Sequence, residues 1–369
     1  MKFSCGKQKL VEALSNVQKA VAQKSTIPAL EGVLIKAQGG MLSLCGYNTE
    51  LSISTDFEAT VNVEGTIVAN AHLFTEIVRK LPHDLVEISV GEDFVIHIFS
   101  GKSKFELLGI DPTEFPSLPA VDDGSCLTLS AGVLRSMIRQ TIFAVSEMDT
   151  KPVQTGTLFE IKDKSLTLVS VDGYRLAMRT EPINYDLELT FVVPGKTLRE
   201  VLRLLPVEDD QTVTLSAGMR HISFNVGEYT VISRLLEGVF LDYKTIIVED
   251  HDHVVGVNTQ NFINSIERVS LLITDRLKSP VRCLFSENKI NISCATVVGK
   301  ATDEIEAKSD ITGEFEIAFN NKYMIDALKN TDCDEVDIKL KGATAPILIS
   351  PKQGNSFLFL VLPVRIKAQ

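Results

Sequence analysis

The stretch that decides the fold is residues 134–145, which read LRSMIRQTIFAV. Apolar or small side chains recur in it at positions i, i+4, i+7 and i+11, the spacing of one face of an α-helix. The same spacing occurs once earlier and once later in the chain, and a proline follows each copy at the same distance. An internal repeat of this size predicts three copies of one structural unit. The three sets are Leu134, Ile138, Thr141 and Val145 with Pro152, Leu10, Leu14, Val17 and Val21 with Pro28, and Phe262, Ile266, Val269 and Ile273 with Pro280.

The repeat divides the chain of 369 residues into three segments of similar length. A period near 124 residues gives each copy enough chain to bury a hydrophobic core of its own. We therefore expect three domains, at residues 1–121, 126–247 and 252–369. Apolar residues make up 44% of the chain and charged residues 23%, which is ordinary for a soluble globular protein.

The expected elements follow the same order in each segment. A short strand and the repeated helix come first, several strands follow, and then a second helix and more strands. This order predicts an α+β fold of three structurally repeated domains, each with two helices packed on antiparallel sheets. Because strand, helix and strands occur twice per segment, each domain is itself expected to be a doubled unit. The expected helices are residues 7–22, 70–81, 131–145, 195–205, 260–273 and 321–330, and one continuous strand is expected over residues 60–68.

The charge of the chain is uneven. A net charge of −11 and a pI near 5.2 argue against a nucleic acid partner, but net charge does not describe any one face of a protein. The outward positions of the expected helices lean basic, which leaves two interpretations open. Lys and Arg are good helix formers that could simply populate solvated faces, or the helices could line a mildly positive surface that contacts phosphates without reading bases. The basic positions are Lys19, Lys24, Arg79, Lys80, Arg135, Arg139, Lys196, Arg199, Arg203, Lys322 and Lys329.

No signature of catalysis or cofactor binding is found. The six cysteines show no C-x-x-C spacing and no adjacent His cluster, which favours free thiols in a reducing cytosol and no metal site. Phosphate loops, nucleophile elbows and zinc-protease motifs are missing, and Asp172-Gly173 is predicted to be a turn rather than an acid–base site. We expect no signal peptide, no membrane span, no cofactor and a cytoplasmic location.

Four features carry a resemblance to a known family. They are the threefold repeat, the run VDGYRLA at residues 171–177, the first-copy exit with Phe105 and residues 111–116, and the C-terminal LPVRI at residues 362–366. In this order they resemble the beta subunit of bacterial DNA polymerase III, the sliding clamp family, over the whole chain. The resemblance implies a non-catalytic, head-to-tail homodimeric ring with its helices inside. Such a ring would encircle duplex DNA without sequence preference and tether the polymerase for processive synthesis.

The resemblance also implies a pocket for short linear peptides from the polymerase and the clamp loader. Such a pocket is an apolar groove with a polar rim, although each residue taken singly could be strand core or turn. The family commonly has His at Tyr174, Pro at Leu241, a basic residue at Thr245 and Met on both sides of Pro363, so the peptide preference is left open, as is the role of the extension Lys367–Gln369. The pocket residues would be Val171, Gly173, Tyr174, Arg175, Leu176, Leu241, Thr245, Ile246, Leu277, Val361, Leu362, Pro363, Val364 and Arg365.

For the ring joint, the resemblance points to a strand edge with Phe105 and Leu107 in the first domain. It would meet Leu271 and Leu272 in the third domain of the other chain, and pairing two exposed edges would protect both. Ordinary core burial is the alternative for these residues. Two other functions stay open at this point. A hydrolase or transferase would show a perturbed acid–base pair in a deep cleft, whereas a structural repeat protein would be a monomer without a basic face.

Overall fold

The computed structural model describes residues 1–121, 125–148, 150–186, 188–247, 250–274, 276–277 and 279–365. The chain divides into two compact units. The first is formed by Met1–Leu134 with Lys196–Leu235, and the second by Arg135–Gly195 with Leu236–Gln369. The division therefore falls inside the middle copy of the repeat.

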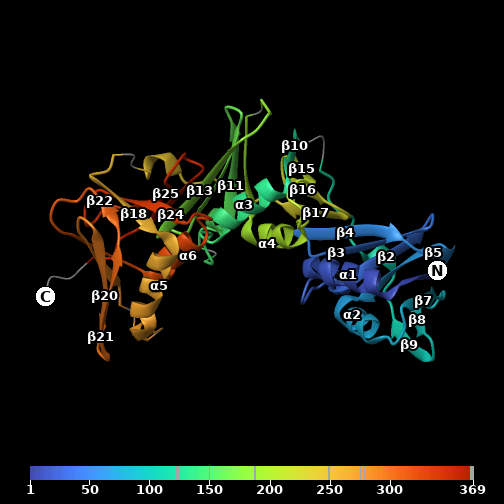
Figure 1. Ribbon diagram of the computed structural model, residues 1–369. Helices are drawn as coiled ribbons and strands as arrows, with labels where there is room; N and C mark the ends of the chain where they lie inside the picture. Colours follow the sequence, from blue (N-terminus) through green and yellow to red (C-terminus); the bar gives the residue numbers. More distant parts are fainter. Residues whose placement is uncertain are drawn as a thin grey trace. The chain divides into compact units, whose positions relative to one another are not determined.

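The first unit holds α1 (Lys7–Val17), α2 (Ala71–Lys80) and most of α4 (Gly195–Leu204). Its strands are β1 (Lys2–Gly6), β2 (Gly32–Gln38), β3 (Met41–Tyr47), β4 (Leu51–Glu58), β5 (Thr60–Val63), β6 (Gly65–Asn70), β7 (Leu85–Val90), β8 (Val95–Ser100), β9 (Ser103–Leu108), β10 (Ser125–Ser130), β15 (Thr212–Ala217), β16 (His221–Val226) and β17 (Tyr229–Arg234). Over the residues described, these strands form a five-stranded antiparallel sheet, β5-β1-β7-β8-β9, and an eight-stranded one, β10-β15-β16-β17-β4-β3-β2-β6. Helices α1 and α2 pack on each other, and α1 also packs on β3 and β4 (Figure 1).

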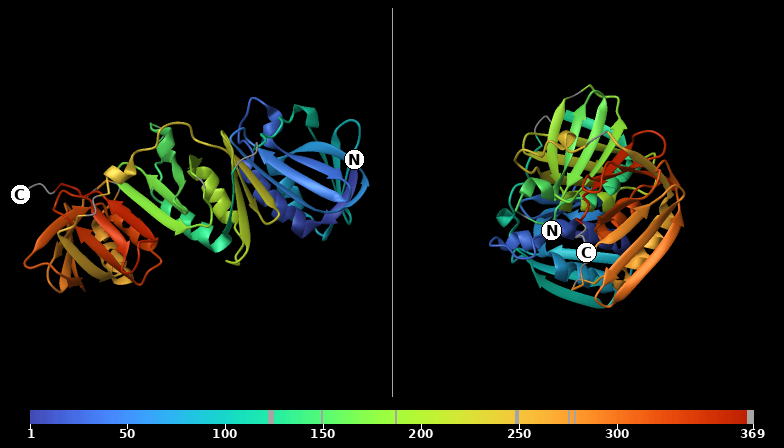
Figure 2. Two further views of the ribbon diagram at one scale, coloured as in Figure 1. Left: turned by 90° about the horizontal axis from the view of Figure 1, so that it is seen from above. Right: turned by 90° about the vertical axis from the view of Figure 1, so that its left-hand side faces the viewer.

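The second unit holds most of α3 (Ala131–Ile142), together with α5 (Thr259–Val269) and α6 (Asn321–Lys329). Its strands are β11 (Gly156–Lys162), β12 (Ser165–Val171), β13 (Arg175–Pro182), β14 (Leu189–Pro194), β18 (His253–Asn258), β19 (Val281–Phe285), β20 (Lys289–Thr296), β21 (Gly299–Glu306), β22 (Lys308–Ser309), β23 (Phe315–Phe319), β24 (Glu335–Leu340), β25 (Ile347–Pro351) and β26 (Phe357–Val361). Within its described part, this unit has a nine-stranded sheet, β14-β11-β12-β13-β26-β25-β24-β18-β22, and a four-stranded one, β21-β20-β19-β23. Figure 2 shows the strands of both units from two further directions.

Each copy of the repeat is a doubled unit, as the order of elements predicts. A strand, a helix and three strands occur twice in each copy, with one additional short strand, β5 or β22, at the end of the first half in the first and third copies. The leading strand of each half pairs with the hairpin of the other half. In the first copy β1 pairs with β7, and β6 pairs with β2. The same exchange joins β10 to β15, β14 to β11, β18 to β24 and β23 to β19. Neither half of a copy can therefore complete its sheet alone.

Sheets also run from one copy into the next. Strand β4 of the first copy pairs with β17 of the second, with Leu51 opposite Ser233. Strand β13 of the second copy pairs with β26 of the third, with Arg175 opposite Val361. These shared sheets explain why the compact units cut through the middle copy. The expected domain bounds remain predictions.

Two expectations about elements are wrong. The repeated helices are shorter than expected and end before the i+11 position of the apolar pattern. Helices α1 and α5 pass into the 3-10 turns Gln18–Ala20 and Ser270–Leu272, and α3 ends at Ile142. The last apolar residue of each pattern therefore follows the helix, although the tight turn still keeps it at least half buried. The strand expected over residues 60–68 is two strands, β5 and β6, in different sheets. At the change of sheet, Gly65 lies against Met1, where a Cβ would come within 2.7 Å of the Met1 Cβ.

Candidate partner-binding, DNA-facing and edge surfaces

The run VDGYRLA forms the turn between β12 and β13, which confirms the predicted turn at Asp172-Gly173. Oδ1 of Asp172 accepts hydrogen bonds from the backbone N–H groups of Tyr174, at 2.9 Å, and Arg175, at 3.0 Å. Gly173 has φ +91°, a left-handed conformation that suits glycine. Residue types and turn geometry thus agree, and the turn presents Tyr174 at its tip with 59% of its surface exposed.

Arg175 lies beneath this turn rather than on a rim, with only 9% of its surface exposed. Its Nε donates to Oδ2 of Asp172 at 2.9 Å, and its Nη1 donates to Oδ2 of Asp326 on α6 at 2.6 Å. The guanidinium carbon lies 4.7 Å from the ring centre of Tyr323 and 5.6 Å from that of Phe143. Because two carboxylates and two ring faces surround it, the buried charge is paired.

Tyr323 and Asp326 of α6 are functional candidates that the sequence did not suggest. The Tyr323 ring stacks on Tyr174, with centres 5.9 Å apart and planes 22° apart. Burial raises the pKa of the Tyr323 hydroxyl, and the nearby Asp172 carboxylate adds to this. The i, i+3 spacing of Tyr323 and Asp326 puts them on one helix face, which is the only signal the sequence offered.

The C-terminal segment reaches the same turn, as the resemblance implies. The N–H of Leu362 donates to the carbonyl of Tyr174 at 2.8 Å, and that of Val364 donates to the carbonyl of Ala318 at 2.7 Å. Leu362 and Pro363 are half buried, while Val364 and Arg365 are exposed. The strand residues Val171, Leu176 and Val361 are core, each at most 5% exposed. Ile366 and the extension Lys367–Gln369 lie outside the described residues.

The last segment of the second copy, after β17, contributes through one buried residue. The hydroxyl of Tyr243 donates to Oε2 of Glu160 on β11 at 2.7 Å, and burial together with this hydrogen bond raises the Tyr243 pKa. Ile246 packs on the same apolar cluster as Val171 and Leu176. Leu241 and Thr245 are exposed beside it. Leu277 is half buried in a separate turn, where its N–H donates to the Thr274 carbonyl at 3.1 Å.

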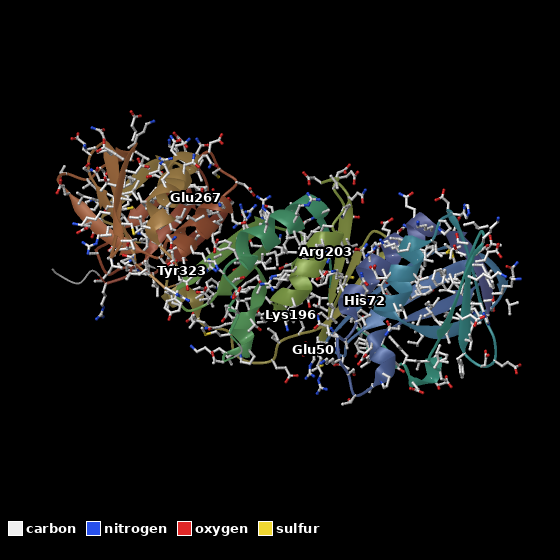
Figure 3. The ribbon with its side chains drawn as sticks, turned by 90° about the horizontal axis from the view of Figure 1, so that it is seen from below. Glu50, His72, Lys196, Arg203, Glu267 and Tyr323 are labelled. Atoms are coloured by element: carbon white, nitrogen blue, oxygen red, sulfur yellow. The ribbon has the colours of Figure 1, made fainter. Side chains whose placement is uncertain are left out.

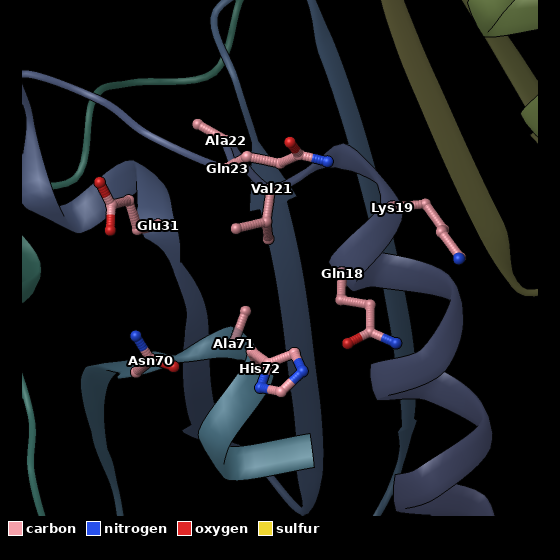
Figure 4. Close-up of a pocket in the computed structure, with 9 residues that line it drawn as sticks. All are labelled: Gln18, Lys19, Val21, Ala22, Gln23, Glu31, Asn70, Ala71 and His72. Atoms are coloured by element: carbon pink, nitrogen blue, oxygen red, sulfur yellow. The ribbon is translucent and has the colours of Figure 1, made fainter. Parts of the chain in front are cut away.

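Two cavities occupy matching places in the first and third copies, between the end of the first helix and the start of the second. The cavity in the first copy has a volume of about 570 Å³, and Figure 4 shows Lys19, Asn70 and His72 at its wall. The cavity in the third copy, of about 540 Å³, borders the C-terminal segment. Its lining is Ile273, Thr274, Ser279, Pro280, Asn320, Asn321, Lys322 and Val364. It therefore adjoins the C-terminal segment described above.

The basic helix residues are at the surface, but several are already paired. Of the eleven predicted cations, Arg135 is half buried and the others are exposed; Figure 3 shows Lys196 and Arg203 on α4. Arg203 pairs with Glu200 at 2.8 Å, and Lys329 with Glu267 at 2.7 Å. Arg79 pairs with Glu76, and Arg139 with Asp332. These carboxylates reduce the positive potential that the helices can offer to a polyanion.

Two sheet edges carry exposed apolar side chains. Strand β9 is the edge of its sheet, with Phe105 38% and Leu108 79% exposed and Leu107 half buried. Strand β21 is the edge of another sheet, and Leu271, 81% exposed, precedes half-buried Leu272 in the 3-10 turn packed against it. The hairpin tip before β21 adds Val297 and Val298, 89% and 66% exposed. Leu108, Val297 and Val298 were missed by the sequence, since their exposure depends on which strands end a sheet.

The described residues contain neither a membrane-spanning helix nor a metal-binding cluster. No helix among them is both long enough and apolar enough to span a membrane. In the same part of the chain, no three His, Cys, Asp or Glu side chains come together in a group that could hold a metal ion.

Three family models match the chain, in order. They describe the N-terminal, central and C-terminal domains of the DNA polymerase III beta subunit, and they match residues 1–119, 128–242 and 244–365. The beta sliding clamp of Halalkalibacterium halodurans is 36% identical over 380 residues, which cover 99% of this chain and 100% of that protein. That of Bacillus subtilis is 34% identical over 377 residues, with the same coverage.

A solved structure agrees with these matches. The crystal structure of the DNA polymerase sliding clamp from Bacillus subtilis is 33% identical to this chain, covers 100% of both chains and has a TM-score of 0.96. The three repeated α+β domains, the order of the family models and the full-length relatives lead to one conclusion. The chain belongs to the DNA polymerase III beta subunit family, the beta sliding clamps.

Proposed function

We propose that this sliding clamp closes as a head-to-tail homodimeric ring, with its helices inside, around duplex DNA. It holds DNA by topology and weak phosphate contacts, without reading sequence and without catalysis or a cofactor. It acts in the cytoplasm, where it tethers the replicative polymerase and binds the clamp loader through short linear peptides. Its domains are residues 1–121, 126–247 and 252–369, a division that the three family models support.

The main support for the ring is that the same kind of sheet junction between copies occurs twice within the chain. Strand β4 pairs with β17, and the matching strand β13 pairs with β26, so each copy joins the last strand of the next copy. The next strand in this series is β21, and the last strand of the first copy is β9; both are sheet edges. Pairing β21 of one chain with β9 of another continues the series and satisfies both edges. Such a contact between unlike surfaces generates a ring when the rotation closes.

The junction between β4 and β17 also gives a register for the proposed joint. Leu51, the first residue of β4, lies opposite Ser233, the second-to-last residue of β17. The matching positions are Gly299, the first residue of β21, and Leu107, the second-to-last residue of β9. Setting Gly299 of one chain opposite Leu107 of the other therefore reproduces the β4–β17 pairing, whereas the β13–β26 junction places the first residue of β13 opposite the last residue of β26.

Continuing this antiparallel register produces complementary contacts. Lys300 comes opposite Glu106, and Ala301 comes opposite Phe105. Oppositely charged cross-strand pairs are favourable, whereas a small residue leaves room for an aromatic ring. The exposed apolar residues beside the two strands would become buried together. We assign the joint to Phe105, Leu107, Leu271 and Leu272, and extend it to Leu108, Val297 and Val298.

The DNA-facing surface rests on exposed helix cations. Among the described residues, no carboxylate forms an ion pair with Lys19, Lys24 or Lys80, or with Lys196, Arg199 or Lys322. We assign these six to phosphate contacts, with Arg135 and the paired cations Arg79, Arg139, Arg203 and Lys329 adding less. Dispersed contacts of this kind attract DNA without fixing its register.

The partner pocket rests on the convergence of the turn and the C-terminal segment. Tyr174 is exposed beside half-buried Leu362 and Pro363, above a core that contains Val171, Leu176 and Val361. Exposed apolar groups over a firm base suit the anchors of a short peptide. We keep the remaining predicted residues in the pocket as rim or base: Gly173, Arg175, Leu241, Thr245, Ile246, Leu277, Val364 and Arg365.

The decisive experiment combines assembly and topology. Sedimentation at micromolar concentration should give the mass of two chains. After loading by the clamp loader of the same organism onto nicked circular DNA, the protein should stay bound until the circle is cut, and then leave through the free ends. A monomer, or equal retention on linear DNA with open ends, would show that the ring proposal is wrong.

A further inference from the structure

Asp326 is placed to influence the partner pocket without touching a ligand there. It lies on α6, and its side chain is 29% exposed. Its Oδ2 accepts from Nη1 of Arg175 at 2.6 Å, while Nε of the same guanidinium donates to Asp172 at 2.9 Å. Two carboxylates, one on the turn and one on the helix, therefore hold the guanidinium in one orientation.

The orientation of Arg175 matters because of the rings around it. Its guanidinium carbon lies 4.7 Å from the centre of the Tyr323 ring and 5.6 Å from the centre of Phe143. Phe143 in turn meets the buried ring of Phe359 edge to face, at 5.2 Å. The guanidinium therefore contacts the core through Phe143, and it restrains the Tyr323 ring through a second cation–π contact.

Tyr323 connects the buried guanidinium of Arg175 to the exposed ring of Tyr174. Its ring stacks on Tyr174, with centres 5.9 Å apart. Tyr174 is the exposed member of the pair, and an exposed aromatic side chain can change rotamer unless a neighbour restrains it. The stack therefore holds the one large exposed ring of the turn in a single position, next to the half-buried Leu362, whose N–H bonds to the Tyr174 carbonyl.

We propose that Asp326 is a positioning residue for partner binding: it orients Arg175, which supports Tyr323, which holds the Tyr174 ring in its binding position. This inference rests on the proposed partner pocket. It explains why a charged residue is buried directly below an exposed aromatic one. It also separates two groups on α6, since Tyr323 and Asp326 serve the pocket while the exposed Lys322 and Lys329 are assigned to DNA.

The test measures binding of the dimer to the immobilised replicative polymerase of the same organism. Asp326→Asn keeps the size of the side chain and removes its charge, and should weaken binding by about tenfold, which corresponds to about 1.4 kcal/mol. Asp326→Glu, which retains a carboxylate, should recover much of this loss. Asp334→Asn makes the same charge change at an exposed position after α6 and should have no effect.

A double mutant separates positioning from general stability. Tyr174→Ala should weaken binding by itself, and adding Asp326→Asn to it should cause no further loss, because the ring to be positioned is gone. Additive losses, or full binding by Asp326→Asn, would overturn the positioning role. If Tyr174→Ala alone binds normally, the pocket assignment itself fails. The melting temperature of each variant shows whether a loss of binding comes from unfolding, and a loss that tracks the melting temperature rather than Tyr174 also counts against the proposal.

Discussion

Lys329 on α6 donates a hydrogen bond to Glu267 on α5, with 2.7 Å between Nζ and Oε1. Both side chains are about half exposed, so the pair lies at the surface. Glu267 thus offsets a cation that we assign to the DNA-facing wall. Exposed ion pairs are worth about 0.2–1 kcal/mol. We therefore expect Glu267→Gln to raise the affinity of the clamp for short duplex DNA by about 1.5- to 5-fold at low salt.

Fluorescence anisotropy over a range of salt concentrations measures this effect. The log–log dependence on salt should become steeper, because more counterions are released when more cations contact phosphate. Glu314→Gln is the matched control, since it changes the net charge equally from an exposed loop before β23. If both variants gain the same affinity, net charge alone is responsible and the wall assignment loses this support.

The proposed joint predicts a charge swap. In the register of the β4–β17 junction, Glu106 of one chain faces Lys300 of the other. Glu106→Lys should weaken the dimer by placing like charges opposite each other, and adding Lys300→Glu should restore it. Analytical ultracentrifugation gives the dimer dissociation constant, for which we expect a weakening of about 3- to 30-fold in the single mutant. Failure of the second substitution to rescue would indicate a different register or a different interface.

The threefold repeat could be predicted from the sequence because the helix spacing at Leu134 recurs with a constant period. The sheet junctions could not be predicted in this way. The pairing of Leu51 with Ser233 joins strands that are far apart in the sequence, and no repeated spacing of residues marks which strands pair. The end of the repeated helix was also placed too late, since an apolar residue such as Val21 is needed inside whether the backbone there is helical or extended.

The pocket was predicted in part, and for a similar reason. The turn around Tyr174 and the C-terminal residues stand in short motifs that can be recognised along the chain. Tyr323 and Asp326 stand on a helix whose pattern fits any solvated surface, and they become pocket residues only when α6 packs beside the turn. Arg175 was predicted as a lining residue, whereas its buried, doubly paired charge makes it a support.

A close approach in the first copy predicts a specific cost. Gly46 on β3 lies so near the end of α1 that a Cβ there would be 2.3 Å from the Val17 carbonyl oxygen. Gly46→Ala must therefore push the helix end away from the sheet, and we expect a loss of about 1–3 kcal/mol in the free energy of unfolding. Gly6→Ala is the control, because a Cβ at Gly6 meets nothing within 4 Å. Equal urea midpoints for the two variants would contradict the close approach.

Two buried thiols of the first copy make stability depend on alkaline pH. Burial raises the pKa of Cys5 and of Cys45 from 9.0 to about 12 in the folded chain. Above pH 9 the unfolded chain loses these protons while the folded chain keeps them, so stability is fully present below pH 9 and falls as the pH rises toward 12. Each thiol contributes about 1.4 kcal/mol per pH unit in this window.

The measurement is urea unfolding between pH 8 and about 10.5, within the window set by the two thiols. Cys5→Ala should lower stability at pH 8, because it removes buried volume, yet it should reduce the fall in stability between pH 9 and 10.5. Cys126→Ala changes an exposed cysteine and should leave the slope as in the parent chain. An unchanged slope in Cys5→Ala would mean that this thiol ionises as readily in the folded chain as in the unfolded one, and that its burial on β1 does not keep it protonated.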